Sequence, residues 1–590
     1  MNPRTVLAES PLFERLTPAA LDALAAQAEI VEIPSGRTLF ERGTAPDSIY
    51  IVATGRLCAV LPDGAIAGTI GRLEPIGEIG ALSGETRVAA VHAVRDSALI
   101  RIPAKHLYAV ISQHPDALAE MTRVIIQRMR QNQRVQRLEH QRQLRCIAVV
   151  PATPDVDVAM VARRLREALA STRSPMLIDA QTVDAALGPG TSQARLDSGE
   201  ENRRLVEFLN RAEVEREYLM YLSGGHADPW ARRCMRQADR ILFVVNASAP
   251  AVVTPMVDEL RRCGARAPVE VIVIRPEGQA AGPVLTWREH VGAQAHYFVR
   301  RDHTGDFASL ARQLTGRGVG LVLGGGGARG FAHIGLIRAL HELNIPVDVV
   351  GGTSMGAFFS ALVACGYDHN EILHIARETF VKTNQLNDYL FPSVSLIRGR
   401  KFVRRMHEIF DERQIQELRK PYFCMSTNLT RGRSVTHDRG PVYMWVATSM
   451  AVPGVAPPVV YRGELLCDGA VVNSLPTDVM QSLERGPIIA SDVSTEGGLA
   501  APGIEGPDPE GLFNLKGDFE KPRLFSIIFR TATLTSESGT AQRAARADVY
   551  LRMPVNGIGL FDWKKLDEVV ERGYRHALEQ LQPVRDKLGV

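Results

Sequence analysis

The pattern of apolar and polar positions divides the first half of the chain into two folded regions and a connector. Residues 10–130 alternate short β-type runs (IVEIP, SIYIVATGRLCAVL, SALIRIP) with glycine turns, between helical patterns, which predicts a small β-roll. Residues 131–145 are basic and rich in glutamine and predict a linker helix. Residues 146–312 alternate apolar runs such as CIAVVPA and DRILFVV with amphipathic helical patterns. That alternation predicts a middle, Rossmann-like α/β domain.

A second α/β pattern covers residues 318–590. Its apolar runs include VGLVL, VDVVGG, PYFCMSTNL and PIIASDVS, and a helical pattern spans 331–343. The amphipathic stretch LDEVVERGYRHALEQLQPV predicts a helix near the end of the chain. We therefore expect a multidomain α/β protein, in which residues 318–480 form the core of the last domain.

Composition adds limits rather than a function. The chain has 590 residues, enough for about three or four domains, and its 45% hydrophobic and 23% charged residues are typical of globular proteins. A formal net charge of +3 is small for this length and predicts no nucleic-acid partner. The seven cysteines form no CxxC pair, which indicates a reducing compartment and neither zinc nor a disulfide framework.

Targeting and ligand-binding signals are also sparse. We find no signal peptide and no run of about 18 uncharged apolar residues that would cross a membrane. We therefore expect a cytoplasmic protein that would reach a lipid substrate from the membrane surface. The middle domain lacks the Gly-Lys-Ser/Thr of a phosphate-binding loop, so no nucleotide is expected there. No carboxylate-rich loop suggests a metal site.

A strand-to-helix turn around Ser354 is the first candidate for chemistry. Gly352 and Gly356 flank this serine in the sequence GTSMG, between the apolar run VDVV and the helical pattern AFFSALVAC. This is the context of a nucleophile elbow, which lifts a serine into an active site. The motif alone is weak in a chain with 50 glycines, and the context strengthens it.

The glycine run GGGGARG also follows an apolar strand and opens a helix. Gly325, Gly327 and Gly330 have the spacing of a dinucleotide fingerprint, but the acidic Asp348 begins its strand instead of ending it. No lysine follows the glycines, which argues against a Walker loop. The role that remains is an oxyanion hole built from backbone N–H groups.

The base that would activate Ser354 is not in this stretch. Asp468, in ELLCDGAVV, lies downstream, and beyond it the only histidine is His576, within the amphipathic C-terminal helix. A packing or surface role suits that histidine better, so a Ser–His–Asp triad has little support. A Ser354–Asp468 dyad needs no histidine.

GGGGARG, GTSMG and DGA, in this order, resemble the patatin-like phospholipases. The likeness extends through LFPSVSLIRGRKF, TSMAVPGVAPPV and CDGAVVNSLPTDV. The resemblance implies a three-layer α/β/α domain, with Ser354 as nucleophile and Asp468 as base. It also implies an oxyanion loop formed by Gly325, Gly326, Gly327 and Arg329.

The segment IGEIGALSGETRVAAVHA resembles the phosphate-binding cassette of cyclic-nucleotide-binding domains. The resemblance implies a site at Gly77, Glu78, Arg87 and Ala89, with cAMP or cGMP as a regulator. Glu85 would lie close to the phosphate, however, and no aromatic lid is identifiable. The alternative is a β-roll kept for docking or dimerisation.

The order of the three regions is similar to that of the neuropathy target esterase family of lysophospholipases, and WARRCMRQADRILFVV fits this resemblance. It implies a serine hydrolase that cleaves acyl esters of lysophospholipids or phospholipids at a membrane surface without a catalytic cofactor. Unlike the animal members, the chain shows one cyclic-nucleotide module and no N-terminal membrane helix. The alternative is a non-catalytic, cyclic-nucleotide-responsive regulator or lipid-binding protein.

A cluster of basic residues leaves two interpretations open. Arg398, Arg400, Lys401, Arg404 and Arg405 could orient phosphate head groups or the membrane, or they could form a solvated helix face.

Overall fold

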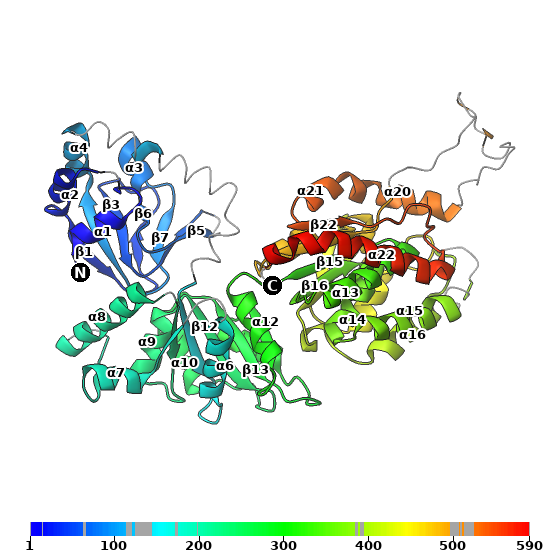
Figure 1. The fold of residues 1–590 in the computed structure, drawn as a ribbon, viewed down its shortest axis with the longest axis horizontal. Helices are drawn as coiled ribbons and strands as arrows, with labels where there is room; N and C mark the ends of the chain where they lie inside the picture. The colour runs from blue at the N-terminus through cyan, green and yellow to red at the C-terminus, as the bar shows by residue number, and fades with distance from the viewer. Residues whose placement is uncertain are drawn as a thin grey trace. The chain divides into compact units, whose positions relative to one another are not determined.

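The computed structural model describes residues 2–14, 16–62, 66–113, 121–123, 144–170, 175–196, 199–216, 218–383, 388–389, 394–495, 507, 510–511 and 524–588. The predicted linker helix at 131–145 lies outside these residues except for its last two positions. The chain forms two compact units, Met1–Ala311 and Arg312–Val590 (Figure 1). Within the described residues, no helix is both long and apolar enough to cross a bilayer.

The first unit begins with the β-roll that the sequence predicted. One antiparallel sheet has the order β1-β8-β3-β6 and the other β2-β7-β4-β5. Strand β3 is buried along its whole length because Ile49 and Ile51 face a core shared with the helices, whereas Val52 faces the core between the sheets. The elements are α1 (Pro3–Glu9), α2 (Pro18–Ala25), β1 (Glu29–Ile33), β2 (Thr38–Phe40), β3 (Ser48–Thr54), β4 (Leu57–Val60), β5 (Ile66–Ile70), β6 (Pro75–Ile76), α3 (Glu78–Ser83), β7 (Ala90–Ala93), β8 (Ser97–Pro103) and α4 (Ala104–Gln113).

The middle domain is a six-stranded sheet of order β10-β11-β9-β12-β13-β14, and every pair in it is parallel. This is the Rossmann-like arrangement expected from alternating strands and helices. Its elements are β9 (Cys146–Pro151), α6 (Val158–Ala170), β10 (Met176–Ile178), α7 (Ala180–Leu187), α8 (Glu200–Glu215), β11 (Leu219–Leu222), α9 (Pro229–Gln237), β12 (Arg240–Asn246), α10 (Pro255–Arg262), β13 (Val269–Ile274), α11 (Val284–Val291), β14 (Ala295–Val299) and α12 (Thr304–Leu314).

A buried ionic cluster joins the β-roll to the middle domain. Arg95, which follows β7, is 1% exposed and pairs with Glu213 at 2.5 Å and with Asp239 at 3.0 Å. The Asp239 carboxylate also accepts the backbone N–H groups of Arg145 and Cys146 at the start of β9. Because removal of one partner would strand a buried charge, the cluster holds the two domains in one arrangement.

The second unit contains an eight-stranded sheet. Its order is β19-β20-β17-β16-β15-β21-β22, with β18 also paired to β17. Five adjacent strands of this sheet, β17-β16-β15-β21-β22, are parallel. The strand order reverses at β15, and α/β sheets bind their ligands at such a position. The strands are β15 (Gly320–Leu323), β16 (Val349–Thr353), β17 (Tyr422–Asn428), β18 (Arg433–His437), β19 (Val459–Tyr461), β20 (Glu464–Asp468), β21 (Ile488–Asp492) and β22 (Val549–Arg552).

Alternation along β15 divides the core of this unit between the two faces of the sheet. Leu321 and Leu323 face the cluster formed with α13, α14, α17 and α22, whereas Val322 faces a smaller cluster with α18. These are the layers of an α/β/α domain, as expected. The helices are α13 (Ala332–Glu342), α14 (Met355–Cys365), α15 (His369–Ala376), α16 (Arg400–Phe410), α17 (Val442–Ser449), α18 (Thr477–Ser482), α20 (Leu524–Ser538), α21 (Thr540–Ala544) and α22 (Leu566–Leu581).

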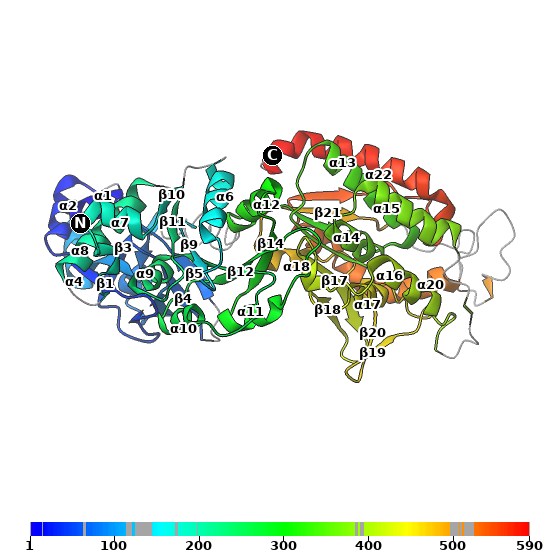
Figure 2. The ribbon, with the colours of Figure 1, turned by 90° about the horizontal axis from the view of Figure 1, so that it is seen from below.

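The predicted C-terminal helix is α22, and it lies against α13 (Figure 2). Glycines permit this close approach. A Cβ atom on Gly335 of α13 would overlap the Val570 carbonyl oxygen, and one on Gly573 of α22 would overlap the Ala332 carbonyl oxygen. The two backbones therefore touch where no side chain separates them.

Gly335→Ala tests this contact. We expect the substitution to lower the stability of the second unit by about 1–3 kcal/mol, since the overlap outweighs the roughly 1 kcal/mol by which alanine favours a helix. A lower urea midpoint would show the effect. Gly224→Ala is the control, because a Cβ atom there meets nothing within 4 Å. Equal midpoints for the wild type and Gly335→Ala would contradict the prediction.

Candidate active site

The turn between β16 and α14 places Ser354 at the carboxyl edge of the sheet. Ser354 has φ +54°, an unfavourable conformation for a residue with a Cβ atom. Gly356 lets the turn pack on the neighbouring strand, because a Cβ atom there would overlap the Leu323 carbonyl oxygen. At Gly352 a Cβ atom would lie 2.5 Å from the carbonyl carbon of Gly356. Tight backbone packing on both sides of Ser354 therefore keeps this residue in its unfavourable backbone conformation.

Asp468 lies at the end of β20 and contacts Ser354 directly. The Ser354 hydroxyl donates a hydrogen bond to Oδ2 of Asp468 at 2.7 Å. Oδ1 of the same carboxylate accepts the backbone N–H of Ala470 at 2.8 Å. The two residues predicted from separate motifs are thus neighbours, although 114 positions separate them.

Burial dominates the electrostatics of Asp468, which is 1% exposed. Burial raises the pKa of the carboxyl to about 7, while the hydrogen bonds from Ala470 and Ser354 lower it by less. The carboxyl therefore gains and loses its proton near neutral pH, as a general base must.

The glycine-rich loop lies beside the serine. A Cβ atom on Gly325 would lie 3.3 Å from Cβ of Ser354, but the Gly325 N–H donates to the Ser474 carbonyl at 3.1 Å. In the described part of the chain, the N–H groups of Gly326 and Gly327 donate to no carbonyl. Gly327 lines the same cavity as Ser354. The free donors of the loop are therefore those of Gly326 and Gly327.

The backbone N–H of Arg329 is already used, because it donates to the Gly326 carbonyl at 3.2 Å, and the side chain holds the loop in place. Its Nε donates to the Ile558 carbonyl at 2.7 Å, and the neighbouring Ala328 N–H donates to the Leu560 carbonyl at 2.8 Å. The loop is thus braced by a segment more than 200 residues further along the chain.

Two further side chains hold the site, and sequence reasoning missed both. His333 is fully buried in α13, with Nε2 2.9 Å from the Gly324 carbonyl and Nδ1 2.9 Å from the Ser491 hydroxyl. Burial lowers the pKa of His333 to about 4, so the ring is neutral and Nε2 carries the proton that the carbonyl accepts. Ser449 accepts the Ser354 backbone N–H at 2.9 Å. The one sequence feature that could have indicated His333 is its position as a histidine in the otherwise apolar helix α13.

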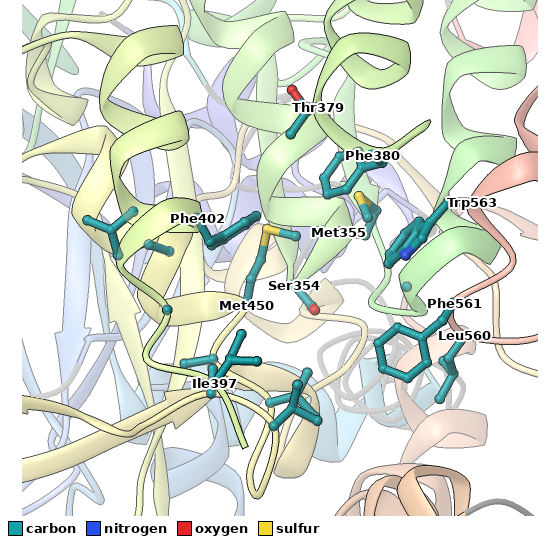
Figure 3. A pocket seen from close by; sticks show the side chains of 18 of the residues that line it. Ser354, Met355, Thr379, Phe380, Ile397, Phe402, Met450, Leu560, Phe561 and Trp563 are labelled. Atoms are coloured by element: carbon teal, nitrogen blue, oxygen red, sulfur yellow. The ribbon is translucent and has the colours of Figure 1, made fainter. Parts of the chain in front are cut away.

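Ser354 opens into a cavity of about 810 Å³, which is within the range of small-molecule sites. Figure 3 shows the serine among apolar side chains, with Phe402 and Met450 on one side and Phe561 and Trp563 on the other. Segments far apart in sequence therefore build one largely apolar chamber.

The predicted cyclic-nucleotide residues also come together, in the first unit. Arg87 donates from Nη1 to the Gly77 carbonyl at 2.8 Å and from Nη2 to the Ser48 carbonyl at 2.5 Å. Glu78, the first residue of α3, is 7% exposed, and Ala89 is half-buried just before β7. The protein's own carbonyls occupy the Arg87 guanidinium, so a phosphate would have to displace them.

Comparison with known proteins gives a match for each region. Residues 321–480 match the patatin-like phospholipase family, 30–114 the cyclic nucleotide-binding domain and 143–300 the Neuropathy Target Esterase family P-loop like domain. An uncharacterized NTE family protein of Mycobacterium tuberculosis (strain CDC 1551 / Oshkosh) is 30% identical over 99% of this chain and 97% of its own length. The chain belongs to the NTE family.

Animal members of the NTE family are longer than this chain. Patatin-like phospholipase domain-containing protein 7 of Mus musculus is 29% identical over 97% of this chain but only 46% of its own length. For protein 6 of Homo sapiens, also 29% identical, the shares are 97% and 45%. The chain thus spans about half the length of these relatives. The resemblance predicted from the sequence, to an NTE-family patatin-like phospholipase with a cyclic-nucleotide-binding domain, is confirmed.

The pKa of Asp468 predicts how an Asp468→Asn variant responds to pH. In the unfolded chain the carboxyl ionises near pH 4, whereas in the folded protein it ionises near 7. Its contribution to stability is therefore complete below about pH 4 and is lost as pH rises through 7. Asparagine does not titrate. We expect the variant to gain stability relative to wild type between pH 5 and pH 8, by about 3 kcal/mol in the free energy of unfolding. Its melting temperature, compared with that of wild type at the same pH, should therefore be higher at pH 8 than at pH 5.

Calorimetric scans at both pH values measure this change. Asp478→Asn serves as control because Asp478 is half-buried and lies outside the serine contact. A difference in melting temperature that is the same at pH 5 and pH 8 would refute the raised pKa.

Proposed function

We propose that the protein is a serine esterase that hydrolyses acyl esters of lysophospholipids or phospholipids. The observation that carries this proposal is the 2.7 Å hydrogen bond from Ser354 to buried Asp468 at the floor of an apolar cavity. Residues 318–590 are the proposed catalytic domain. Family membership supports the same reaction class.

In the proposed mechanism, Ser354 Oγ attacks the ester carbonyl while Asp468 accepts the hydroxyl proton. The N–H groups of Gly326 and Gly327, with that of Met355 at the start of α14, stabilise the oxyanion. Asp468 then returns the proton to the leaving alkoxide, and an acyl-enzyme forms. Water, deprotonated by Asp468, cleaves it and releases the fatty acid.

The cavity supports an acyl substrate held at a membrane surface. Val381, Tyr389 and Phe561 line it and are also 36%, 72% and 38% exposed. Apolar side chains that are open to solvent at a ligand cavity are a feature of surfaces that contact membranes. We therefore propose that the protein works at the cytoplasmic surface of a membrane, where an acyl chain can pass from the lipid phase into the cavity.

We also propose that a cyclic nucleotide, cAMP or cGMP, binds the N-terminal domain and regulates the esterase. The match of residues 30–114 and the approach of Arg87 to Gly77 support a site there. Because the guanidinium already serves two carbonyls, binding requires Arg87 to exchange them for the phosphate.

The proposed reaction is tested by fatty-acid release from lysophosphatidylcholine. We expect Ser354→Ala and Asp468→Asn each to reduce kcat/KM at least 1,000-fold, because each removes an essential part of the dyad. For the wild type, kcat/KM should rise about tenfold per pH unit below 7 and level off above it, since only ionised Asp468 is a base.

Ser482→Ala is a matched control, because Ser482 is exposed and, within the described residues, its hydroxyl donates to the Val479 carbonyl alone. Undiminished release by either dyad variant would disprove the dyad. Absence of release by the wild type would favour the alternative, a lipid-binding regulator without turnover.

Cyclic-nucleotide binding is tested by titration calorimetry with cAMP and cGMP. We expect Arg87→Gln to weaken binding at least tenfold, because a charge-assisted hydrogen bond to the phosphate is lost. Arg42→Gln, at an exposed position of the same β-roll, should bind as the wild type does. No heat of binding with wild type would argue for a domain kept for docking.

A further inference from the structure

The basic run that follows residue 397 separates into two groups in the structure. Arg405 of α16 bonds Thr379 at 3.1 Å and Glu408 at 3.0 Å, and so belongs to the packing of the helix. Lys401 lines neither the catalytic cavity nor the groove described next. The remaining arginines border an open groove of about 410 Å³, lined by Arg398, Gly399, Arg400, Val403, Arg404, His407 and Tyr443.

These three arginines differ from most others in the unit. Arg398, Arg400 and Arg404 are exposed, and within the described residues their side chains form neither an ion pair nor a hydrogen bond. Arg312 and Arg377, in contrast, each form a two-pronged pair with an aspartate. Three uncompensated guanidinium groups around one hollow form a site for a dianionic or monoanionic oxygen group, above all a phosphate.

Two carboxylates lie close to the groove without neutralising it. Asp388 accepts the Lys401 backbone N–H at 3.4 Å, and Glu412 accepts from, or pairs with, His407 at 2.8 Å. Asp388 contacts Arg398 only through its backbone, since its carbonyl accepts the Arg398 N–H at 2.9 Å. Among the residues that the structure describes, neither carboxylate pairs with a guanidinium of the groove. The positive charge is therefore local to Arg398, Arg400 and Arg404.

The groove adjoins the catalytic cavity. Arg398, Gly399 and Val403 line both, and the cavity also contains Ser354. In a glycerophospholipid only the glycerol backbone separates the acyl ester from the phosphate. A substrate whose ester carbonyl is at Ser354 can thus extend its head group past Arg398 into the groove.

We propose that Arg398, Arg400 and Arg404 bind the head-group phosphate of the substrate and make the enzyme selective for acyl esters that carry a phosphate over neutral acylglycerols. This inference rests on the proposed esterase function. It assigns the basic run to two roles, because Lys401 and Arg405 of the same helix lie outside the groove.

The test compares two monomeric substrates with the same acyl chain, lysophosphatidylcholine and monoacylglycerol, each below its micellar concentration. For Arg400→Gln/Arg404→Gln we expect KM for lysophosphatidylcholine to rise about tenfold or more, with kcat and the constants for monoacylglycerol within twofold of wild type. Lys401→Gln removes the same kind of charge from the same helical turn and should change neither substrate.

Salt provides a second readout. Raising the ionic strength should increase KM for lysophosphatidylcholine in the wild type, and less so in the double variant, because screening acts on an exposed charge pair. Equal effects of the double substitution on both substrates, or no effect on either, would overturn the proposal. Weaker binding to anionic vesicles with an unchanged KM for the monomeric phospholipid would overturn it as well, in favour of a bilayer contact.

Binding without turnover separates this inference from the esterase proposal. In a Ser354→Ala background, lysophosphatidylcholine affinity measured by calorimetry should fall about tenfold when Arg400 and Arg404 are replaced. That result would support the groove even if wild type released no fatty acid. Unchanged affinity would refute the groove even if the esterase were active.

Discussion

The site depends on the contact between the backbone of α14 and the carbonyl end of β15. Gly356 lies so close to Leu323 that any side chain at this position would collide with its carbonyl oxygen. This approach forces the sharp turn that gives Ser354 its positive φ and places it beside the glycine-rich loop. One packing constraint therefore places Ser354, the proposed nucleophile, beside the loop whose N–H groups are the proposed oxyanion donors.

At Asp468 the feature that suits the proposed chemistry lowers the stability of the fold. Its carboxylate has hydrogen bonds, but among the residues that the structure describes no cation lies close enough to offset its burial. Burial keeps the proton affinity high, which suits a base that must take a proton from a serine. The folded protein consequently holds Asp468 in a buried position, where its carboxyl ionises only near neutral pH. Burial of the ionised carboxyl lowers the stability of the fold as the pH rises through 7, and the proposed role as a base would account for its position.

Much of this arrangement was predictable from the sequence, and the reasons are local. Strand alternation, the glycine spacing around Ser354 and the order of the motifs indicated the α/β fold and brought Asp468 into consideration. The contributions of His333 and Ser449 were not predictable, because they depend on hydrogen bonds to residues distant in the sequence, Ser491 and Ser354, that no periodicity reveals. The loop donors were only partly assigned, since the bond from Gly325 to Ser474 depends on how two distant loops meet.

The basic run illustrates the same limit on charged surfaces. From spacing alone, Arg400 and Arg405 are equivalent cations of one helix. In the fold they differ, because Arg405 meets Glu408 and Thr379 while Arg400 faces an open groove. The contacts around each side chain, which sequence spacing does not report, separate a residue that packs against its neighbours from one that is open to a ligand.

The bracing of the glycine-rich loop by residues 558–560 has a consequence for how this enzyme class is divided into parts. The segment recognisable as patatin-like ends at residue 480, yet the carbonyls of Ile558 and Leu560 hold the loop, and Phe561 and Trp563 wall the chamber. The segment that matches the family is therefore shorter than the set of residues that builds the cavity. A protein shortened to its recognisable segment would keep Ser354 and Asp468 and lose Phe561 and Trp563 from the cavity wall, so residues 558–563 belong to the proposed catalytic site.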